Sequence, residues 1–530
     1  MRFSYARPVL GVCLLLLVNF NFEQVETANI LGIFPYQYTS PFLVVKPFVQ
    51  SLVQRGHNVT LITPKSMPEV NGVRYLRVTN LNKRIQKLLE SDELFDFIIN
   101  KWRESILATK MYFHMCQDIL SDDAVQRMLK DRNEHFDLIM MEATNLDALC
   151  GLVEYYNATL VGLSFLNFNW YTEERAGNHA PSIYQPISHI GYSRDYSLLS
   201  RIFNWIHITE EMLMESLIIL PSQLQLFKKF FGYSEQKFYE LRNKYSVILV
   251  NDHFSMGNVR ANVPNIIEVG GLHLSEPPEP SDESLQRFMD EAEHGVIYFS
   301  MGLDILVQFL PDNMQQPMMQ AFSQLKQRVV WKNELFNMPN KSENVYAIEK
   351  APQRHILEHP NIRLFITNGG SLSVMEAVYS GVPMLGLPVF FDQFGNLRFA
   401  ELAGMAEVLD INTLNADILT NTIRELIKNP KYTLRAKEMS NTFRDRPMSP
   451  LDAAVWWTEY ALRNRNPAHM RLNKEEISLM RYYRLDWMLP FGLRFIIVFG
   501  SVLYLIWKVI QKKREWKKTK ELKMLQPTSQ

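Results

Sequence analysis

Apolar and polar positions alternate along the first half of the chain with two different periods. Short apolar runs with the length of buried strands lie at 30–34, 59–62, 138–141 and 159–162. Helical spacing is found at 42–54 and 146–155, and the first of these helices begins favourably at Ser40 and Pro41. Strands that alternate with helices predict a doubly wound, parallel α/β domain, with a largely helical insertion at about 81–132.

A second alternating half follows a break in this pattern. The segment 251–284 contains the acidic, proline-rich run 276–283, which is typical of a linker. Beyond it we predict strands at 295–299, 329–332, 345–348, 362–366 and 384–387, and helices at 312–327 and 372–379. This order predicts a second parallel sheet. The aromatic-rich helix 451–463 is expected to pack across the two domains.

The two ends of the chain indicate the secretory pathway. Two arginines precede an apolar run at 9–18, and the small residue Ala28 follows it, as in a cleavable signal. Residues 488–507 carry one charge, and at about 1.5 Å per residue a helix of this length crosses a hydrocarbon core. Eight basic and two acidic residues follow at 508–530, which predicts a cytosolic tail and a lumenal main part.

These boundaries predict a seven-part organisation. The parts are a signal peptide 1–28, an α/β domain 29–262, a linker 263–285, an α/β domain 286–450, helices with a juxtamembrane segment 451–487, a transmembrane helix 488–507 and a basic tail 508–530. Sequons at Asn58, Asn157 and Asn340 are compatible with a glycoprotein of the secretory lumen.

Composition excludes some classes of protein. The 56 Lys and Arg balance 56 Asp and Glu, so no net charge favours a nucleic-acid partner. Three cysteines cannot build a disulfide framework, and loss of Cys13 with the signal leaves at most one bridge, between Cys116 and Cys150. We expect no metal site.

Glycines mark the clearest local motif of the second half. The predicted strand at 362–366 runs into Gly369 and Gly370, and a helix follows. Backbone N–H groups at such a helix start can hold a phosphate, although many α/β turns need glycine for packing alone.

A longer set of motifs surrounds these glycines. It comprises Lys350-Ala-Pro-Gln353, His359-Pro360, Phe365-Ile-Thr-Asn-Gly-Gly370, Glu376-Ala377, Gly381-Val-Pro383, Pro388 and Asp392-Gln393, with Phe299-Ser-Met-Gly302, Val269-Gly-Gly-Leu-His273 and Arg55-Gly-His-Asn-Val-Thr60 further upstream. Over essentially the whole chain, the sequence resembles the animal membrane-bound branch of the UDP-glycosyltransferase family. The resemblance implies a GT-B fold, in which two Rossmann-like domains face a cleft. The first domain then binds the acceptor and the second the UDP-sugar.

The resemblance also implies a donor site. Glu376 matches the residue that bonds the ribose, Asp392 and Gln393 match those that bond the sugar, and Gln353 lies beside the nucleoside. Carboxylate and amide oxygens suit hydroxyl groups because each accepts an O–H in a defined direction. The other expected donor-side positions are Gly302, Leu303, Lys350, Asn368, Gly369, Gly370 and Ser373.

Several positions depart from the family pattern. Asn368 replaces a histidine that touches the diphosphate, Leu303 replaces a serine, and Lys350 replaces a tryptophan that stacks on uracil. Loss of stacking weakens nucleotide binding by about 1–3 kcal/mol. More seriously, the catalytic histidine is replaced by Pro41, which cannot accept a proton.

The remaining catalytic candidates are carboxylates and distant histidines. The acidic partner of the missing histidine falls on Glu142, and Asp147 is a second candidate. His114, His179 and His189 lie in insertions of the first domain and are alternative bases. Each of these side chains also has an ordinary structural interpretation, as a helix-terminal acid or a surface or core histidine.

Two functions therefore remain open. In the first, an inverting transferase moves a hexose, with glucose expected, from a UDP-sugar to a small lipophilic acceptor such as an amine, a carboxylate or an acidic phenol. UDP-sugar is then a co-substrate, and no cofactor is expected. In the second, a catalytically degenerate relative binds a lipophile or pairs with an active homologue. By family analogy we expect a single-pass protein of the endoplasmic reticulum membrane that acts in detoxification, contacts membrane lipid and assembles with itself or homologues.

Overall fold

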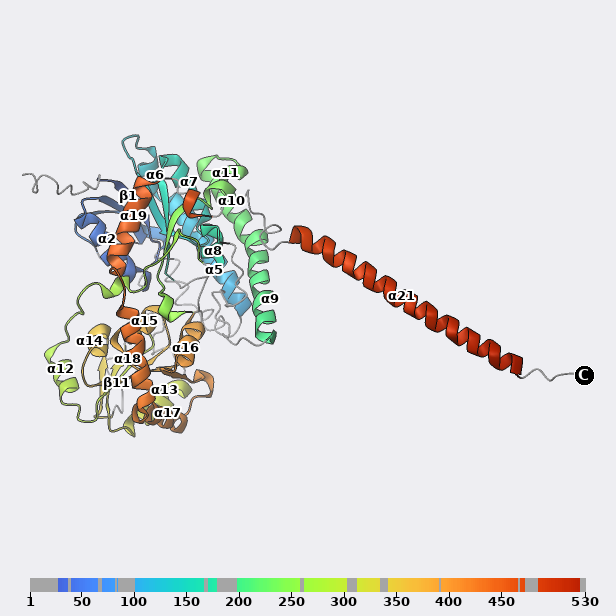
Figure 1. The fold of residues 1–530 in the computed structure, drawn as a ribbon. Coiled ribbons are helices and arrows are strands. Elements are labelled where there is room, and N and C mark those ends of the chain that lie inside the picture. The colour runs from blue at the N-terminus through green and yellow to red at the C-terminus, as the bar shows by residue number, and fades with distance from the viewer. Residues whose placement is uncertain are drawn as a thin grey trace, which may run out of the picture. The chain divides into compact units, whose positions relative to one another are not determined.

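The structure is a computed structural model. It describes residues 27–36, 40–64, 69–81, 83, 101–165, 170–178, 198–257, 262–302, 312–333, 342–389, 392–465, 468–471 and 485–524. The chain forms two compact units, Met1–Arg471 and Leu472–Gln530. The larger unit contains two separate sheets with their helices, and the smaller one contains a single long helix among its described residues (Figure 1). Most of the predicted signal peptide lies outside the described residues.

The first sheet has seven strands in the order β3-β2-β1-β4-β5-β6-β7, and all pairs are parallel. Its strands are β1 (Asn29–Ile33), β2 (Asn58–Pro64), β3 (Val73–Val78), β4 (Leu138–Glu142), β5 (Thr159–Ser164), β6 (Tyr245–Val250) and β7 (Ile266–Glu268). The chain order reverses between β1 and β4, where Ile33 pairs with Met141. Such a switch point is where ligands bind in doubly wound sheets, outside the carboxyl ends of the strands.

Helices cover this sheet and explain why β4, β5 and β6 are buried along their whole length. They are α2 (Ser40–Gln54), α5 (Lys101–Ser121), α6 (Asp123–Lys130), the 3-10 turn η1 (Asp147–Cys150), α7 (Gly151–Tyr156), α8 (Trp170–Ala176), α9 (Leu198–Met214), the π-helical turn η3 (Glu215–Ile219), α10 (Leu220–Phe231) and α11 (Glu235–Leu241). Cys116 and Cys150 are both buried and free, so the bridge left open by the sequence is not formed.

The second sheet has six strands in the order β10-β9-β8-β11-β12-β13, again all parallel. Its strands are β8 (Val296–Ser300), β9 (Arg328–Lys332), β10 (Val345–Ile348), β11 (Ile362–Thr367), β12 (Met384–Gly386) and β13 (Ala406–Val408). Its helices are α12 (Glu283–Asp290), α13 (Asp312–Ser323), α14 (Gln353–Leu357), α15 (Ser371–Ser380), α16 (Gln393–Leu402), α17 (Ala416–Lys428) and α18 (Pro430–Arg444). Two apolar cores form, one on each face of the sheet.

The two parallel sheets confirm the predicted α/β class, with three differences in detail. The structure adds β3, β6 and β13 to the strands predicted from the sequence. Segment 263–285, predicted as a linker, contains β7 and the 3-10 turn η5 (Leu272–Leu274), and β7 is the edge strand of the first sheet. The helix predicted at 146–155 begins instead as the 3-10 turn η1.

Helix α19 (Pro450–Arg463) returns the chain from the second half to the first. It contacts α2 and the strands β5, β6 and β7, and Val455 is 1% exposed at this contact. Its buried Glu459 lies 3.6 Å from Nε2 of His57 and 3.8 Å from Nη1 of Arg55. The first half is therefore completed by a helix that follows the second half in sequence.

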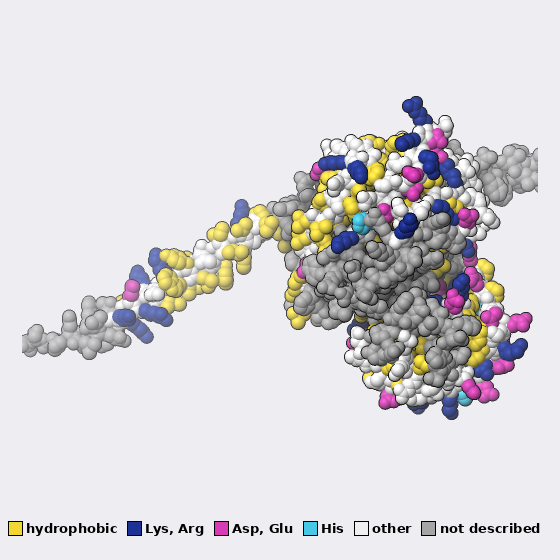
Figure 2. Space-filling model, turned by 180° about the vertical axis from the view of Figure 1, so that it is seen from behind, with side chains coloured by type: hydrophobic (Ala, Val, Ile, Leu, Met, Phe, Trp, Pro, Cys, Tyr) yellow, Lys and Arg dark blue, Asp and Glu magenta, His cyan; other side chains and the backbone are white. Residues whose placement is uncertain are grey.

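Helix α21 (Leu485–Met524) forms the described part of the smaller unit. Its stretch Met488–Lys518 is long and apolar enough to cross a membrane, and none of its most apolar window is buried within the protein. Figure 2 shows this apolar stretch in yellow and a cluster of basic side chains toward its far end. The helix contains the predicted span 488–507 and is consistent with a single-pass membrane anchor.

Val455→Ala tests the role of α19. Removing two buried methyl groups from a close-packed contact costs about 2 kcal/mol, so we expect a lower unfolding temperature for the full chain in detergent. Ile418→Ala on α17 is the control, because Ile418 is 44% exposed and its truncation leaves no cavity. Equal unfolding temperatures for both variants would contradict the packing of α19 on the first half.

Candidate functional site

The loops at the carboxyl edge of the second sheet contain the predicted donor-side residues. Gly302 follows β8, Lys350 follows β10, and Asn368 to Gly370 follow β11. Gln353 begins α14, Ser373 and Glu376 lie on α15, and Asp392 and Gln393 begin α16. Because the strands are parallel, these separate segments emerge on one side of the sheet. Leu303 lies outside the described residues.

A polar cluster surrounds Glu376. Nε2 of Gln353 donates hydrogen bonds to Oε2 of Glu376 at 2.6 Å and to Oγ of Ser373 at 3.0 Å. The hydroxyl of Tyr298 in turn donates to Oε1 of Gln353 at 3.2 Å. Burial raises the pKa of Glu376 to about 7, against the lowering effect of the bond from Gln353. The carboxyl group is thus held in place but is only partly ionised at neutral pH.

His273 lies on the other side of this carboxyl group. Its Nε2 lies 3.6 Å from Oε1 of Glu376. Burial, with a further contribution from the charge of Arg354, lowers the pKa of His273 to about 3, so the imidazole is neutral. Tyr298 and His273 were not among the predicted site residues. His273 could have been found from its place in the motif after Gly270 and Gly271, whereas Tyr298 is one of many buried aromatics.

Two glycine loops meet beside Asn368. Gly302 and Gly369 have φ angles of +82° and +87°, a region that favours glycine. A Cβ atom on Gly302 would lie 3.2 Å from Nδ2 of Asn368, and one on Gly369 would lie 2.4 Å from Cγ of Leu397. Because glycine has no Cβ atom, the loops after β8 and β11 can approach each other and helix α16. Gly370 directly precedes α15, and the N-terminal end of a helix favours an anion.

Helix α16 is joined to the glycine loop by an asparagine. Nδ2 of Asn396 donates to Oδ2 of Asp392 at 2.7 Å and to the carbonyl oxygen of Gly369 at 3.0 Å. Oε1 of Gln393 accepts a bond from the backbone N–H of Val389 at 2.9 Å. Burial raises the pKa of Asp392 to about 6. Asp392 and Gln393 are thus positioned relative to the glycines by short, specific bonds.

The carboxyl edge of the first sheet contains Glu142 and Pro41. Glu142 ends β4 and is 6% exposed, and its Oε2 has no hydrogen-bond partner among the described residues. Burial alone raises its pKa to about 8. Pro41 lies in the first turn of α2, which follows β1, the parallel neighbour of β4. Both segments therefore leave the sheet on the same side.

Aromatic side chains lie at this same edge. The buried ring of Tyr36, beyond β1, contacts the ring of Phe165, beyond β5, edge to face at 6.1 Å between centroids. Phe34 contacts the same ring at 6.3 Å. The edge thus combines an apolar wall with the carboxyl group of Glu142, a combination suited to a lipophilic molecule with one polar group.

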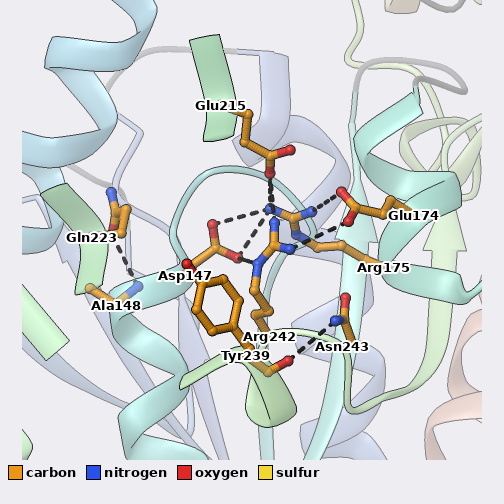
Figure 3. Close-up of polar contacts among 9 residues, drawn as sticks. All are labelled: Asp147, Ala148, Glu174, Arg175, Glu215, Gln223, Tyr239, Arg242 and Asn243. Carbon is orange, nitrogen blue, oxygen red and sulfur yellow. Dashed lines mark hydrogen bonds and ion pairs between the residues drawn. The ribbon is translucent and has the colours of Figure 1, made fainter. Parts of the chain in front are cut away.

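Asp147, the second catalytic candidate, belongs to a buried ion-pair cluster (Figure 3). Its carboxylate lies 3.1 Å from Nη2 of Arg175 and 3.4 Å from Nε of Arg242. Both arginines also bind Oε1 of Glu215, at 3.1 and 2.6 Å, and each reaches Glu174 at 3.4 Å. The members come from η1, α8, η3 and the end of α11, so the cluster joins four elements.

The acids of this cluster stabilise the charge of its buried arginines. Burial opposes the charge of Arg175, but Asp147, Glu215 and Glu174 together raise its pKa well above the usual value. The carboxylate of Asp147 thus contacts two guanidinium groups, and we interpret its role as structural. Arg175, Arg242 and Glu215 escaped prediction because they are far apart in sequence.

Of the three alternative histidines, His114 alone lies in the described part of the chain. His114 is half-buried on α5, where its ring contacts Phe113 at 5.5 Å between centroids. His179 and His189 lie outside the described residues. Among the described residues there is no group of three His, Cys, Asp or Glu that could hold a metal ion.

Comparison with known proteins decides the family. The profile of the UDP-glucoronosyl and UDP-glucosyl transferase family matches residues 30–518. This chain belongs to that family. It is 32% identical to UDP-glucosyltransferase 2 of Dactylopius coccus, with 87% of this chain and 88% of the relative covered. It is also 27% identical to human UDP-glucuronosyltransferase 2B15, with 90% and 92% covered.

Solved structures agree with this family at the level of the fold. The calicheamicin glycosyltransferase CalG4 superimposes with a TM-score of 0.59 at 18% identity, over 83% of this chain and 99% of that chain. The two parallel sheets of this UDP-glycosyltransferase family member are thus GT-B-like, as the resemblance implied. Family membership also implies a UDP-sugar donor.

Asp147→Asn tests the structural interpretation of the ion-pair cluster. The variant loses the carboxylate that contacts both buried arginines, and breaking a buried pair costs roughly 3–5 kcal/mol. We expect a clearly lower unfolding temperature, whereas Asp417→Asn, at an exposed position on α17, should change it little. A variant of Asp147 with normal stability and lost transferase activity would instead indicate a catalytic role.

Proposed function

We propose that this protein is an inverting UDP-glycosyltransferase that moves a hexose, with glucose favoured, from a UDP-sugar to small lipophilic acceptors. The observation that carries the proposal is the cluster of Gln353, Ser373 and Glu376 at the carboxyl edge of the second sheet. Its carboxyl group is oriented by an amide and offers oxygens to a pair of hydroxyls. The name of the relative UDP-glucosyltransferase 2 supports glucose as the sugar.

The other donor-side residues have complementary roles in this proposal. Glu376 accepts the ribose hydroxyls, while the N–H groups at the start of α15 bind the diphosphate. Asn368 donates its amide N–H to the same phosphates in place of a histidine. Asp392 and Gln393 bind the sugar hydroxyls. The exposed Lys350, which follows β10, takes the place of the aromatic residue that would stack on the uracil.

The chemical step depends on the acceptor because the usual base is missing. The acceptor nucleophile attacks the anomeric carbon from the face opposite UDP, the bond from that carbon to the diphosphate oxygen breaks, and UDP leaves. Glu142 is the only acid at the chemical centre that we assign, and its pKa of about 8 leaves it mostly protonated at neutral pH. A base contributes about 10²–10⁴ in rate. Acceptors that need little deprotonation, such as amines, carboxylates and acidic phenols, are therefore favoured.

A second candidate function follows from Pro41. By the family resemblance, Pro41 matches the position of the catalytic histidine. It lies in the first turn of α2, where a proline favours the start of a helix. In this alternative the chain binds a lipophile or pairs with an active homologue without turnover.

We also propose a location in the endoplasmic reticulum membrane, with the larger unit in the lumen. The basic side chains at the C-terminal end of α21, which include Lys512, Lys513 and Arg514, support a cytosolic end for this helix.

Calorimetric titration of the full chain with UDP tests the donor site. If binding needs ionised Glu376, the affinity should rise roughly tenfold between about pH 6 and pH 8, as its pKa of about 7 is crossed. Glu376→Gln should bind more weakly and show only the pH dependence of UDP itself. Glu293→Gln, which changes an exposed carboxyl before β8, should behave like the unaltered protein.

Failure of UDP to bind the folded protein at millimolar concentration would exclude the transferase proposal. If Glu376→Gln binds UDP as well as the unaltered protein does, the protein has a donor site, but this cluster is not part of it.

An acceptor panel with Glu142→Gln tests the chemical step. Transfer to hydroxyl acceptors should rise with pH through about 8 as Glu142 ionises, and this rise should vanish in the variant. Amines should respond less. The pKa of Glu142 is about 8 in the folded protein and 4.5 ordinarily, so the native state keeps a proton that the unfolded chain releases. The free energy of unfolding should therefore fall as the pH rises from about 4.5 to about 8, and it should fall less in the variant. UDP binding without turnover of any acceptor would favour the non-catalytic alternative.

A further inference from the structure

Helix α9 and the turn η3 present large apolar side chains to solvent. The exposed residues are Leu199 (68%), Ile202 (44%), Ile206 (40%), Met212 (45%), Leu213 (54%), Leu217 (71%) and Ile218 (52%). Their spacing places most of them on one face of a continuous helical rod. Figure 1 shows α9 at the edge of the larger unit, and apolar side chains are visible along that edge, at the left, in Figure 2.

The opposite face of the same rod contains acidic residues that are buried. Oε2 of Glu211 accepts a bond from Nε1 of Trp170 at 2.7 Å. Four residues further on, Glu215 enters the ion-pair cluster through Arg175 and Arg242. Glu211 and Glu215 are 6% and 4% exposed. Two acids thus lie on the buried face, beside the buried Ile208, Met214 and Ile219. Seven large apolar side chains are nevertheless exposed on the same helical segment, which is unusual for a surface helix.

The π-helical turn η3 contributes to this exposed apolar surface. Its wider turn lies between α9 and α10, where Glu215 points into the cluster while Leu217 and Ile218 point to solvent. The three contacts of Glu211 and Glu215 hold the rod in the orientation that leaves these apolar side chains exposed. An exposed face of this kind marks a surface that meets an apolar partner.

The remainder of the chain identifies a lipid bilayer as that partner. The larger unit ends at Arg471, and the membrane-spanning candidate begins at Met488, within a helix that starts at Leu485. The intervening segment 472–484 extends at most about 45 Å at about 3.5 Å per residue. A short tether keeps the larger unit at a high effective concentration next to the membrane.

The start of the tether also lies on the same half of the molecule as the apolar face. Arg471 donates a hydrogen bond to the carbonyl oxygen of Asn243, which follows α11, and the carbonyl oxygen of Met470 accepts one from Asn265. Helix α11 contacts α10, which continues the α9 rod. The chain therefore leaves for the membrane from the first half rather than the second.

We propose that the outward face of α9 and η3 is a second membrane contact, which lies in the interfacial region of the bilayer that α21 spans. A helix in this position buries its apolar face about 5–10 Å into the boundary between headgroups and acyl chains. The contact places the first sheet next to the phase in which lipophilic molecules dissolve. It does not depend on the proposed transferase activity.

Site-directed fluorescence on the full chain in phosphatidylcholine vesicles tests this contact. Leu217→Cys is labelled with a bimane dye, and the buried Cys116 and Cys150 remain unlabelled in the folded protein. We expect brominated phosphatidylcholine to quench the dye and aqueous iodide to quench it poorly. Ile418→Cys, at an exposed site on α17, should show the opposite response.

A charge placed in the face provides the matched variant. Leu213→Glu in the Leu217→Cys background should abolish quenching by lipid and restore quenching by iodide. Its unfolding temperature should be unchanged because Leu213 is already 54% exposed. Quenching of Leu217→Cys by iodide but not by lipid would overturn the proposal. Protection from both quenchers would also overturn it, and crosslinking between two labelled copies would then identify a homodimer interface.

Discussion

Parallel strand pairing is the constraint on which the rest of this structure depends. Every strand pair in both sheets is parallel. After each strand, a crossover must therefore return the chain from the carboxyl ends of the strands to their amino ends. All carboxyl ends consequently lie on one side of each sheet. Gly302 and Asn368 meet there because of this topology, although they are far apart in sequence.

Burial of charge has two different outcomes in the molecule. Asp147 and Glu215 are buried with two arginines, and the cluster holds four helical elements together. Burial still raises the pKa of Glu215, although both arginines act against this effect. Glu142 and Glu376 are buried without a cation in direct contact, and the cost of desolvation raises their pKa values to about 8 and 7. Such groups lower the stability of the native state, which a protein tolerates most readily where a ligand or a reaction uses them.

The exposed apolar surface of α9 and η3 depends on the same ion-pair cluster. Because Glu215 is held by Arg175 and Arg242, the face of the helix that includes Leu213 and Leu217 remains exposed. One set of buried charges thus completes the first half and sets the orientation of its most apolar surface.

The sequence by itself determined the fold class, most strands, the apolar C-terminal helix and the family, because these depend on local periodicity and on short motifs. It also placed most of the expected donor-side residues in loops that follow strands or at the helix starts beyond them. Only the tertiary structure showed that Asp147 is paired with Arg175, that His273 and Tyr298 join the Glu376 cluster, and that β7 completes the first sheet. These features are contacts between residues distant in sequence. Burial, which decides whether a carboxyl group is paired, ionised or neutral, exists only once the chain has folded.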